Sequence, residues 1–147
     1  MRFMMIVKAS KDSEAGVLPS TELVKAMGKF NEEMVKSGVL LAAEGLHPSS
    51  QGARVRFSGG KTTVVDGPFT EAKELIAGFW LIQVKSKPEA IQWASRCPSP
   101  DEDGLDGEIE IRRVFEASDF PAEIFPPEEA SREQALRAEI EKRTLKA

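Results

Sequence analysis

Three short runs of this chain are apolar at nearly every position, and they limit its fold more than any other feature. The runs are 3–7, 39–43 and 79–84. Successive side chains of a β-strand point to opposite faces, so a strand that is apolar throughout is buried on both sides. We therefore predict three strands that lie inside a layered fold.

Two segments carry the signals of amphipathic helices. The first begins after Ser20 and ends before Gly38, a typical glycine position after a helix. Its apolar stripe, at i, i+4, i+7 and i+11, consists of Leu23, Met27, Phe30 and Met34. The second begins at Ser86, whose spacing to Glu89 predicts a capping box. We expect its inward residues to be Ala90, Ile91, Ala94 and Cys97.

The remaining patterns complete an α+β fold. Segments 54–57 and 61–65 flank Gly59-Gly60 as a β-hairpin, and 108–112 alternates as a last strand. The order β-α-β-β-β-β-α-β predicts a ferredoxin-like antiparallel sheet with two helices on one face. We assign it to residues 1–125 and treat residues 126–147, with a charged helix, as a C-terminal appendage.

Two helices cover one face of such a sheet, yet the three strands are apolar on both of their faces. The second face would therefore be left exposed in a single chain. Large exposed apolar patches are rare on monomers. A second copy of the chain is the simplest cover, so we predict a homodimer.

Composition excludes several classes of protein. The formal net charge of −4 argues against nucleic-acid binding, which depends on clustered lysine and arginine. The N-terminal apolar run stops at Lys8, too short for a membrane span, and we expect no membrane association. The single cysteine, Cys97, forms no internal disulfide, and no Cys/His cluster has zinc spacing. We expect a cytoplasmic protein without a metal or organic cofactor.

The stretch 64–74, Val-Val-Asp-Gly-Pro-Phe-Thr-Glu-Ala-Lys-Glu, joins a β-branched run to an acidic turn. It resembles the DGPF signature of YCII-related proteins, and the resemblance extends from Met1 to about Phe120. The resemblance implies a dimeric α+β barrel. In better-studied relatives a helix histidine and a nearby acid are the suspected catalytic pair, but here Met27 and Lys36 stand near those places.

Asp66 is the first candidate for catalysis, because Gly67 and Pro68 after it form a turn that can direct a carboxylate inward. The alternative is that Asp66 caps its own turn by accepting backbone N–H groups. His47, the only histidine, is the second catalytic candidate, since imidazole transfers protons near neutral pH. A solvated bystander is the alternative for His47.

Four further residues are assigned to ligand binding: Glu44, Phe69, Glu71 and Lys73. Lys73 could neutralise an anionic ligand or lower the pKa of Asp66. Thr70 is a suitable N-cap, so a short capped turn also accounts for Glu71 and Lys73. We interpret Cys97 as core, because no recognisable cation or base activates it.

Two classes of function stay open. The first is binding of a small organic molecule in a cleft near the DGPF turn of a homodimer, with acid–base catalysis through Asp66 or His47 as an extension. The alternative is a noncatalytic regulatory or assembly module that uses the tail helix.

Overall fold

The structure is a computed structural model that describes residues 1–99 and 107–146. It consists of two compact units, Met1–Val114 and Phe115–Ala147. The predicted boundary between residues 125 and 126 lies inside the second unit.

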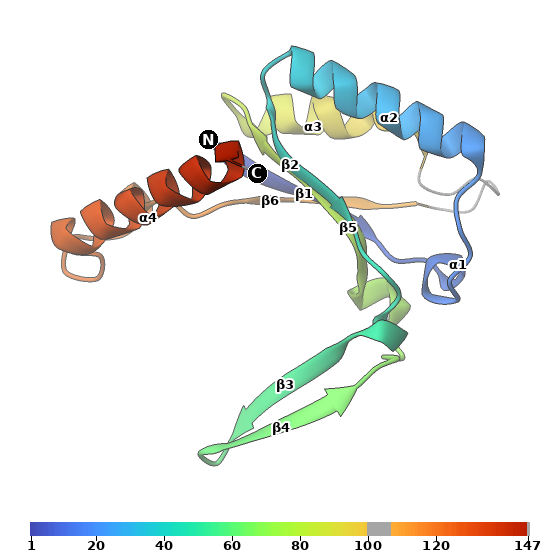
Figure 1. Cartoon of the computed structure of the whole chain (residues 1–147), viewed down its shortest axis with the longest axis horizontal. Coiled ribbons are helices and arrows are strands. Elements are labelled where there is room, and N and C mark those ends of the chain that lie inside the picture. The colour runs from blue at the N-terminus through green and yellow to red at the C-terminus, as the bar shows by residue number, and fades with distance from the viewer. Residues whose placement is uncertain (100–106, 147) are drawn as a thin grey trace. The chain divides into compact units, whose positions relative to one another are not determined.

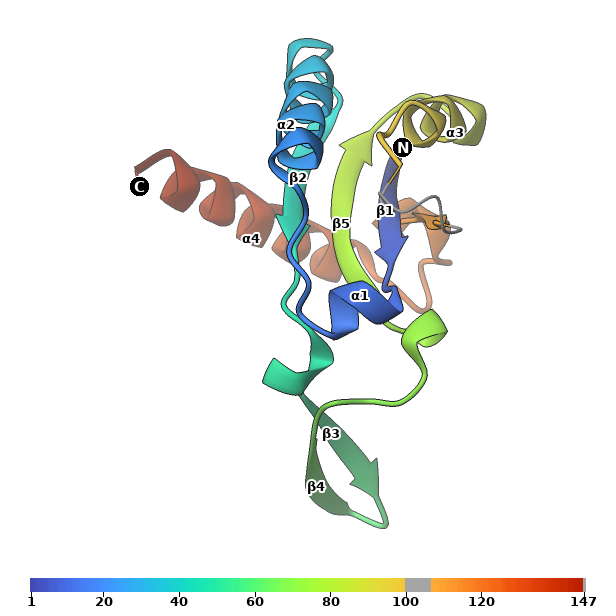
Figure 2. The ribbon, with the colours of Figure 1, turned by 90° about the vertical axis from the view of Figure 1, so that its right-hand side faces the viewer.

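The first unit is built on a four-stranded antiparallel sheet (Figure 1). Its strands are β1 (Arg2–Lys8), β2 (Leu40–Gly45), β5 (Ile76–Gln83) and β6 (Ile109–Arg113), in the order β2-β5-β1-β6. Helices α2 (Thr21–Lys36) and α3 (Lys87–Ser95) lie on the same face of the sheet (Figure 2). The α+β, ferredoxin-like prediction is confirmed.

Helix α2 has the caps and the buried stripe that the sequence predicts. The Ser20 hydroxyl accepts a hydrogen bond from the Leu23 N–H at 3.1 Å, which satisfies one open donor of the first turn. Phe30 and Met34 are buried. Gly38, just past the helix, has a φ of 73°, which favours glycine.

Helix α3 differs from the prediction at two points. The Ser86 hydroxyl accepts from the Glu89 N–H, but the Glu89 carboxylate accepts from the Lys85 N–H, so the second half of the capping box is shifted by one residue. Ile91 was expected to point inward and is 45% exposed, whereas Trp93 is 8% exposed. The larger indole takes the core position on this short helix.

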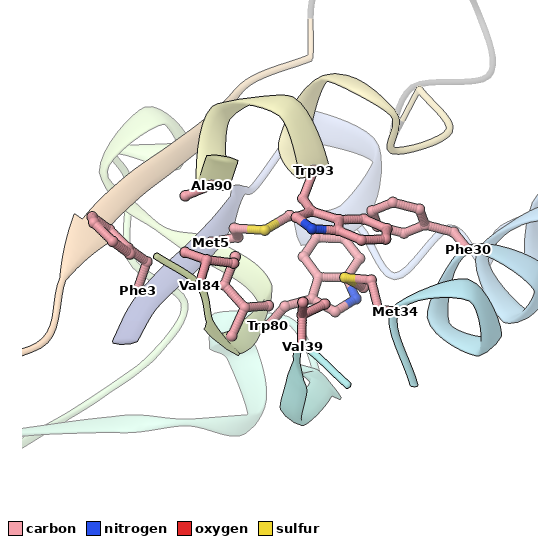
Figure 3. Packing of buried hydrophobic residues seen from close by; sticks show 10 residues of the cluster. Phe3, Met5, Phe30, Met34, Val39, Trp80, Val84, Ala90 and Trp93 are labelled. Carbon is pink, nitrogen blue, oxygen red and sulfur yellow. The ribbon is translucent and has the colours of Figure 1, made fainter. Parts of the chain in front are cut away.

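Aromatic rings fill the space between the helices and the sheet (Figure 3). The rings of Phe30 and Trp80 meet edge to face at 5.8 Å, and Trp93 lies 6.3 Å from Phe30. Met5, Met34 and Ile82 are fully buried beside them. Edge-to-face contact adds about 0.5–1.5 kcal/mol to the area that such rings bury.

A separate two-stranded sheet is formed by β3 (Ala53–Ser58) and β4 (Lys61–Asp66). Both glycines of its turn, Gly59 and Gly60, have positive φ. The predicted hairpin is therefore confirmed, and it extends away from α2 and α3 (Figures 1 and 2).

The structure also contains four short helical elements. The sequence predicted a capped turn near the third of them and no helix at the other three. Helix α1 (Lys11–Glu14) begins with a capping box of Ser10 and Ser13. The others are 3-10 turns: η1 (Ser49–Gln51), η2 (Ala72–Glu74) and η3 (Ala117–Asp119). Thr70 does not cap η2, because the residue before this turn is Glu71 and no side-chain cap bond forms.

The second unit contains η3 and the helix α4 (Pro127–Lys146). Phe120 lies between Phe115 and Phe125, with ring centroids 4.9 and 5.7 Å away. Helix α4 buries no residue and carries i,i+4 ion pairs such as Arg143–Glu139. No described helix is both long enough and apolar enough to cross a membrane.

Candidate functional site

A cleft of about 940 Å³ lies between α2 and the sheet in the first unit. Its walls come from the linker 16–19, the inner side of α2, the end of β2 with residues 46–48, and the start of β5 at 77–80. Ligand sites in proteins are typically clefts of about 300–1,000 Å³ with mainly apolar walls. The size and the lining of this cleft fit that description.

Apolar side chains remain exposed around the cleft. Val17, Leu18, Val24 and Leu46 all line it, and they are 59%, 84%, 55% and 46% exposed. Exposed apolar side chains gathered in one cleft are typical of a ligand-binding groove.

One polar pair crosses the cleft wall. The Trp80 indole Nε1–H donates to the Asn31 Oδ1 at 2.7 Å, and both residues line the cleft. Because the indole is a donor only, this bond fixes which end of the Asn31 amide is oxygen. The amide nitrogen of Asn31 has no acceptor among the described residues. Because no buried side-chain polar atom of the described residues lacks a partner, its two N–H donors are open to solvent.

A second set of bonds links α1, the turn at 48–52 and the signature. The Glu14 carboxylate accepts from both the Ser49 N–H and the Ser49 hydroxyl. The same hydroxyl oxygen accepts from the Phe69 N–H at 3.0 Å. Three segments distant in sequence therefore meet at Ser49, beside the cleft residues Pro48 and Gln51.

The signature packs tightly against this turn. The Gly67 N–H donates to the Gly52 carbonyl at 3.0 Å. A Cβ atom on Gly67 would lie 1.7 Å from the Ser49 carbonyl oxygen, so no side chain fits there. The Gly67–Pro68 peptide bond is cis. The Arg54 guanidinium stacks 3.8 Å above the ring of Phe69.

Asp66 lies at the end of β4, opposite Ala53, and is exposed. It is not among the described residues that line the cleft. Its side chain makes no hydrogen bond or ion pair with the described part of the chain, including the turn N–H groups that it was suggested to cap.

The other predicted site residues divide between the cleft and the signature. His47 and Glu44 both line the cleft, and no hydrogen bond or ion pair joins their side chains in the described residues. Phe69 contacts Arg54 instead, and Glu71 is exposed before η2. The side chain of Lys73 lies outside the part that the structure describes. The structure thus brings together His47 and Glu44, but not Asp66, at the cleft.

Cys97 has the surroundings of a structural thiol. Its Sγ lies 3.9 Å from the Met27 Sδ, in a partly buried position. Burial raises the pKa of Cys97 to about 11. A thiol with so high a pKa is a poor nucleophile at neutral pH. No group of three or more His, Cys, Asp or Glu residues suited to a metal occurs in 1–99 or 107–146.

Sequence reasoning missed Asn31, Trp80 and the short helix α1. Asn31 is the one amide side chain on the buried side of α2, three residues from Met34 and one from Phe30. A polar residue beside an apolar stripe was the available signal. Its partner Trp80 could not be identified, because the two are 49 positions apart.

The family model described as the YCII-related domain matches residues 1–118. An uncharacterised protein of Rhizobium meliloti (strain 1021) is 36% identical over 72 residues, which is 49% of this chain and 58% of that protein. The chain therefore matches less than two thirds of that relative.

Among solved structures, one similar chain is the 5-chloro-2-hydroxyhydroquinone dehydrochlorinase of Burkholderia phenoliruptrix AC1100, in complex with 2,5-dihydroxybenzoquinone. It is 14% identical, with a TM-score of 0.44, over 82% of this chain and 100% of that one.

Proposed function

Because the chain belongs to the YCII-related domain family and has an apolar cleft beside α2, we propose that it binds a small, uncharged and mainly apolar organic molecule there. The observation that carries this proposal is the amide nitrogen of Asn31, which has no acceptor among the described residues and lies in a mainly apolar cleft wall. A ligand acceptor would replace water at these N–H donors, and such a hydrogen bond contributes about 0.5–1.5 kcal/mol net.

The charges around the cleft support an uncharged ligand. Glu44 is the one residue with a full charge among the described residues that line it, and none of these is lysine or arginine. A carboxylate or phosphate would enter without a counter-charge and close to a like charge, which is unfavourable at low dielectric. A carbonyl or ether oxygen satisfies Asn31 without that cost.

Three probes of similar size test this proposal: 2-acetonaphthone, 2-ethylnaphthalene and 2-naphthoate. We expect 2-acetonaphthone to shift the Trp80 indole N–H signal in a ¹H–¹⁵N spectrum, with the signal assigned by a Trp93→Phe variant. One hydrogen bond of about 1 kcal/mol should make it bind about fivefold more tightly than 2-ethylnaphthalene. The charged 2-naphthoate should bind more weakly than both.

Asn31→Asp keeps the acceptor for Trp80 but removes the two amide donors. It should abolish the preference for the ketone. Gln92→Glu makes the same chemical change on an exposed position of α3 away from the cleft and is the control. If no probe shifts cleft signals, the binding function is rejected; if all bind without preference for the ketone, only the role of Asn31 is rejected.

A second candidate function is proton transfer at a bound ligand, favoured by the position of His47 in the cleft lining. A neutral imidazole would take a proton from the carbon next to a carbonyl and leave an enolate, then return a proton. With 2-acetonaphthone in D₂O, the protein should accelerate exchange of the methyl protons, and His47→Gln should remove the acceleration. Equal exchange with and without protein would reject catalysis of this kind.

We also propose that the protein acts as a homodimer in the cytoplasm. Met4 pairs with Leu81 and Ile6 with Phe79, which places these apolar residues on the sheet face opposite to α2 and α3. A second sheet is a suitable cover for them. Leu81→Lys should then give a monomer in sedimentation velocity, while a soluble wild-type monomer at micromolar concentration would exclude the dimer.

A further inference from the structure

One wall of the cleft runs along α2. The helix residues that line it are Leu23, Val24, Met27, Gly28 and Asn31. They stand at positions i, i+1, i+4, i+5 and i+8, so they form one continuous side of the helix. Eight residues of an α-helix advance about 12 Å along its axis. A molecule that contacts the whole of this wall must therefore be elongated.

The two ends of the wall differ in chemistry. At one end the amide nitrogen of Asn31 has no acceptor among the described residues, while the amide oxygen accepts from Trp80. At the other end, near the start of α2, Leu18 and Val24 line the cleft and are 84% and 55% exposed. A hydrogen-bond acceptor suits the first end, and a hydrocarbon suits the second.

Gly28 lies between these ends, four residues after Val24 and three before Asn31. Glycine inside a helix is less stable than alanine, so it usually has a structural reason. Its φ is not positive. Outside its own stretch of helix, no heavy atom of the described residues lies within 4 Å of the place where a Cβ would stand. Neither backbone conformation nor packing requires this glycine, and the space beside it opens to the cleft.

We propose that the ligand of this cleft is an unbranched amphiphile with a carbonyl head and a hydrocarbon tail. The head accepts from the Asn31 amide, and the tail lies along α2, over Gly28, to the exposed apolar side chains of Leu18 and Val24. Gly28 contacts the tail, because the absence of a side chain lets it approach the helix backbone. This inference rests on the binding function proposed above and names the class of its ligand.

A series of methyl ketones tests the length of the ligand. The members are 2-pentanone, 2-heptanone and 2-nonanone, each titrated into the full chain and followed by the indole N–H signal of Trp80. A fully buried methylene increases the affinity about fourfold, so we expect the dissociation constant to fall about two- to fourfold for each added methylene.

The matched control for the series is 5-nonanone, which has the same formula as 2-nonanone and its carbonyl in the middle of the chain. With this head on Asn31, its tail toward Leu18 and Val24 is three carbons shorter. It should therefore bind about tenfold or more weakly than 2-nonanone.

Gly28→Leu places a side chain where the tail should lie. Lys29→Leu is the control, because Lys29 is exposed on α2 and is not among the described residues that line the cleft. We expect Gly28→Leu to raise the dissociation constant of 2-nonanone about fivefold or more, and that of 2-pentanone less. The control should stay within about twofold of the wild type.

The same variant separates a ligand role from a structural role. Leucine is a better helix former than glycine, and the position is open, so Gly28→Leu should raise the midpoint of urea unfolding. A lower midpoint would show that the fold needs glycine here and would overturn the role of Gly28 in binding.

Two further results would overturn the inference while 2-acetonaphthone still binds. One is a set of ketone dissociation constants that does not depend on chain length, and the other is a Gly28→Leu variant that binds 2-nonanone as tightly as the wild type. The proposed binding function would survive both. If neither the alkanones nor 2-acetonaphthone shift the Trp80 signal, the binding function is rejected together with the inference.

Discussion

Replacing Gly67 by alanine tests whether the signature turn is required for its backbone packing. The added Cβ would lie 1.7 Å from the Ser49 carbonyl oxygen and 2.6 Å from the Ser49 carbonyl carbon. Both atoms belong to the main chain, so no side-chain rotation can relieve the clash. The φ of Gly67 is not positive, so alanine has no backbone strain of its own there. Any effect therefore comes from the forced separation of the signature and the turn.

The loss of free energy of unfolding that this separation causes has an expected range. Overpacking by one methyl group typically destabilises by about 1–3 kcal/mol. Separation also weakens the bonds from the Gly67 N–H to Gly52 and from the Phe69 N–H to Ser49. We expect the amides of residue 67 and Phe69 to exchange with solvent roughly 5- to 150-fold faster, the factor that corresponds to 1–3 kcal/mol.

Hydrogen exchange followed by NMR resolves these two amides, and urea unfolding reports whether the whole unit is affected. With a typical urea slope of about 2 kcal/mol/M, the midpoint should fall by about 0.5–1.5 M if the loss is global. Gly52→Ala is the matched control, because its Cβ would be 3.5 Å from the same Ser49 oxygen, an ordinary contact. Equal exchange rates and midpoints in the two variants would refute the packing argument.

Three other changes test separate features. Asp66→Asn should leave the affinity for 2-acetonaphthone and the urea midpoint equal to those of the wild type, because Asp66 is outside the cleft lining. A weaker affinity of the variant in titration would show that Asp66 takes part in ligand binding. The rate at which iodoacetamide modifies Cys97 should rise about tenfold for each pH unit up to about pH 11, because the raised pKa keeps the thiol protonated below that pH. A modification rate that stops rising near pH 9, followed by mass spectrometry, would contradict this. Removal of residues 126–147 should leave one cooperative unfolding transition of the first unit, and aggregation in light scattering would show that the tail is needed.

Local patterns predicted most of the fold because local physics decides it. The stripe from Leu23 to Met34 has the helical period, and the Gly59-Gly60 turn requires positive φ that glycine supplies. The prediction for Ile91 was wrong because a nine-residue helix allows two apolar stripes, and only packing against Phe30 selects the one with Trp93. Periodicity alone cannot decide which of two apolar side chains, Ile91 or Trp93, is buried in the core.

The candidate site was less accessible from sequence, because long-range packing creates it. The cleft lies between α2, the end of β2 and the start of β5. The Asn31–Trp80 hydrogen bond forms only when α2 packs at the right distance from β5. His47 and Glu44 were identified by residue type and by their place at a strand end, and the structure puts both in the cleft lining. Asp66 was selected for the signature around it, yet the tight contacts of the signature are made by Gly67 and Phe69.

Those contacts give the signature a positional role that does not require its carboxylate. Pro48 and Gln51 of the turn at 48–52 line the cleft, while Ser49 and Gly52 bind Phe69 and Gly67 at the base of the β3–β4 hairpin. Glu14 holds the same turn from α1. The hairpin of β3 and β4 is therefore attached to the segment that forms one end of the cleft. The close backbone contact of Gly67 with Ser49 therefore links the position of the hairpin to the position of the turn that lines the cleft.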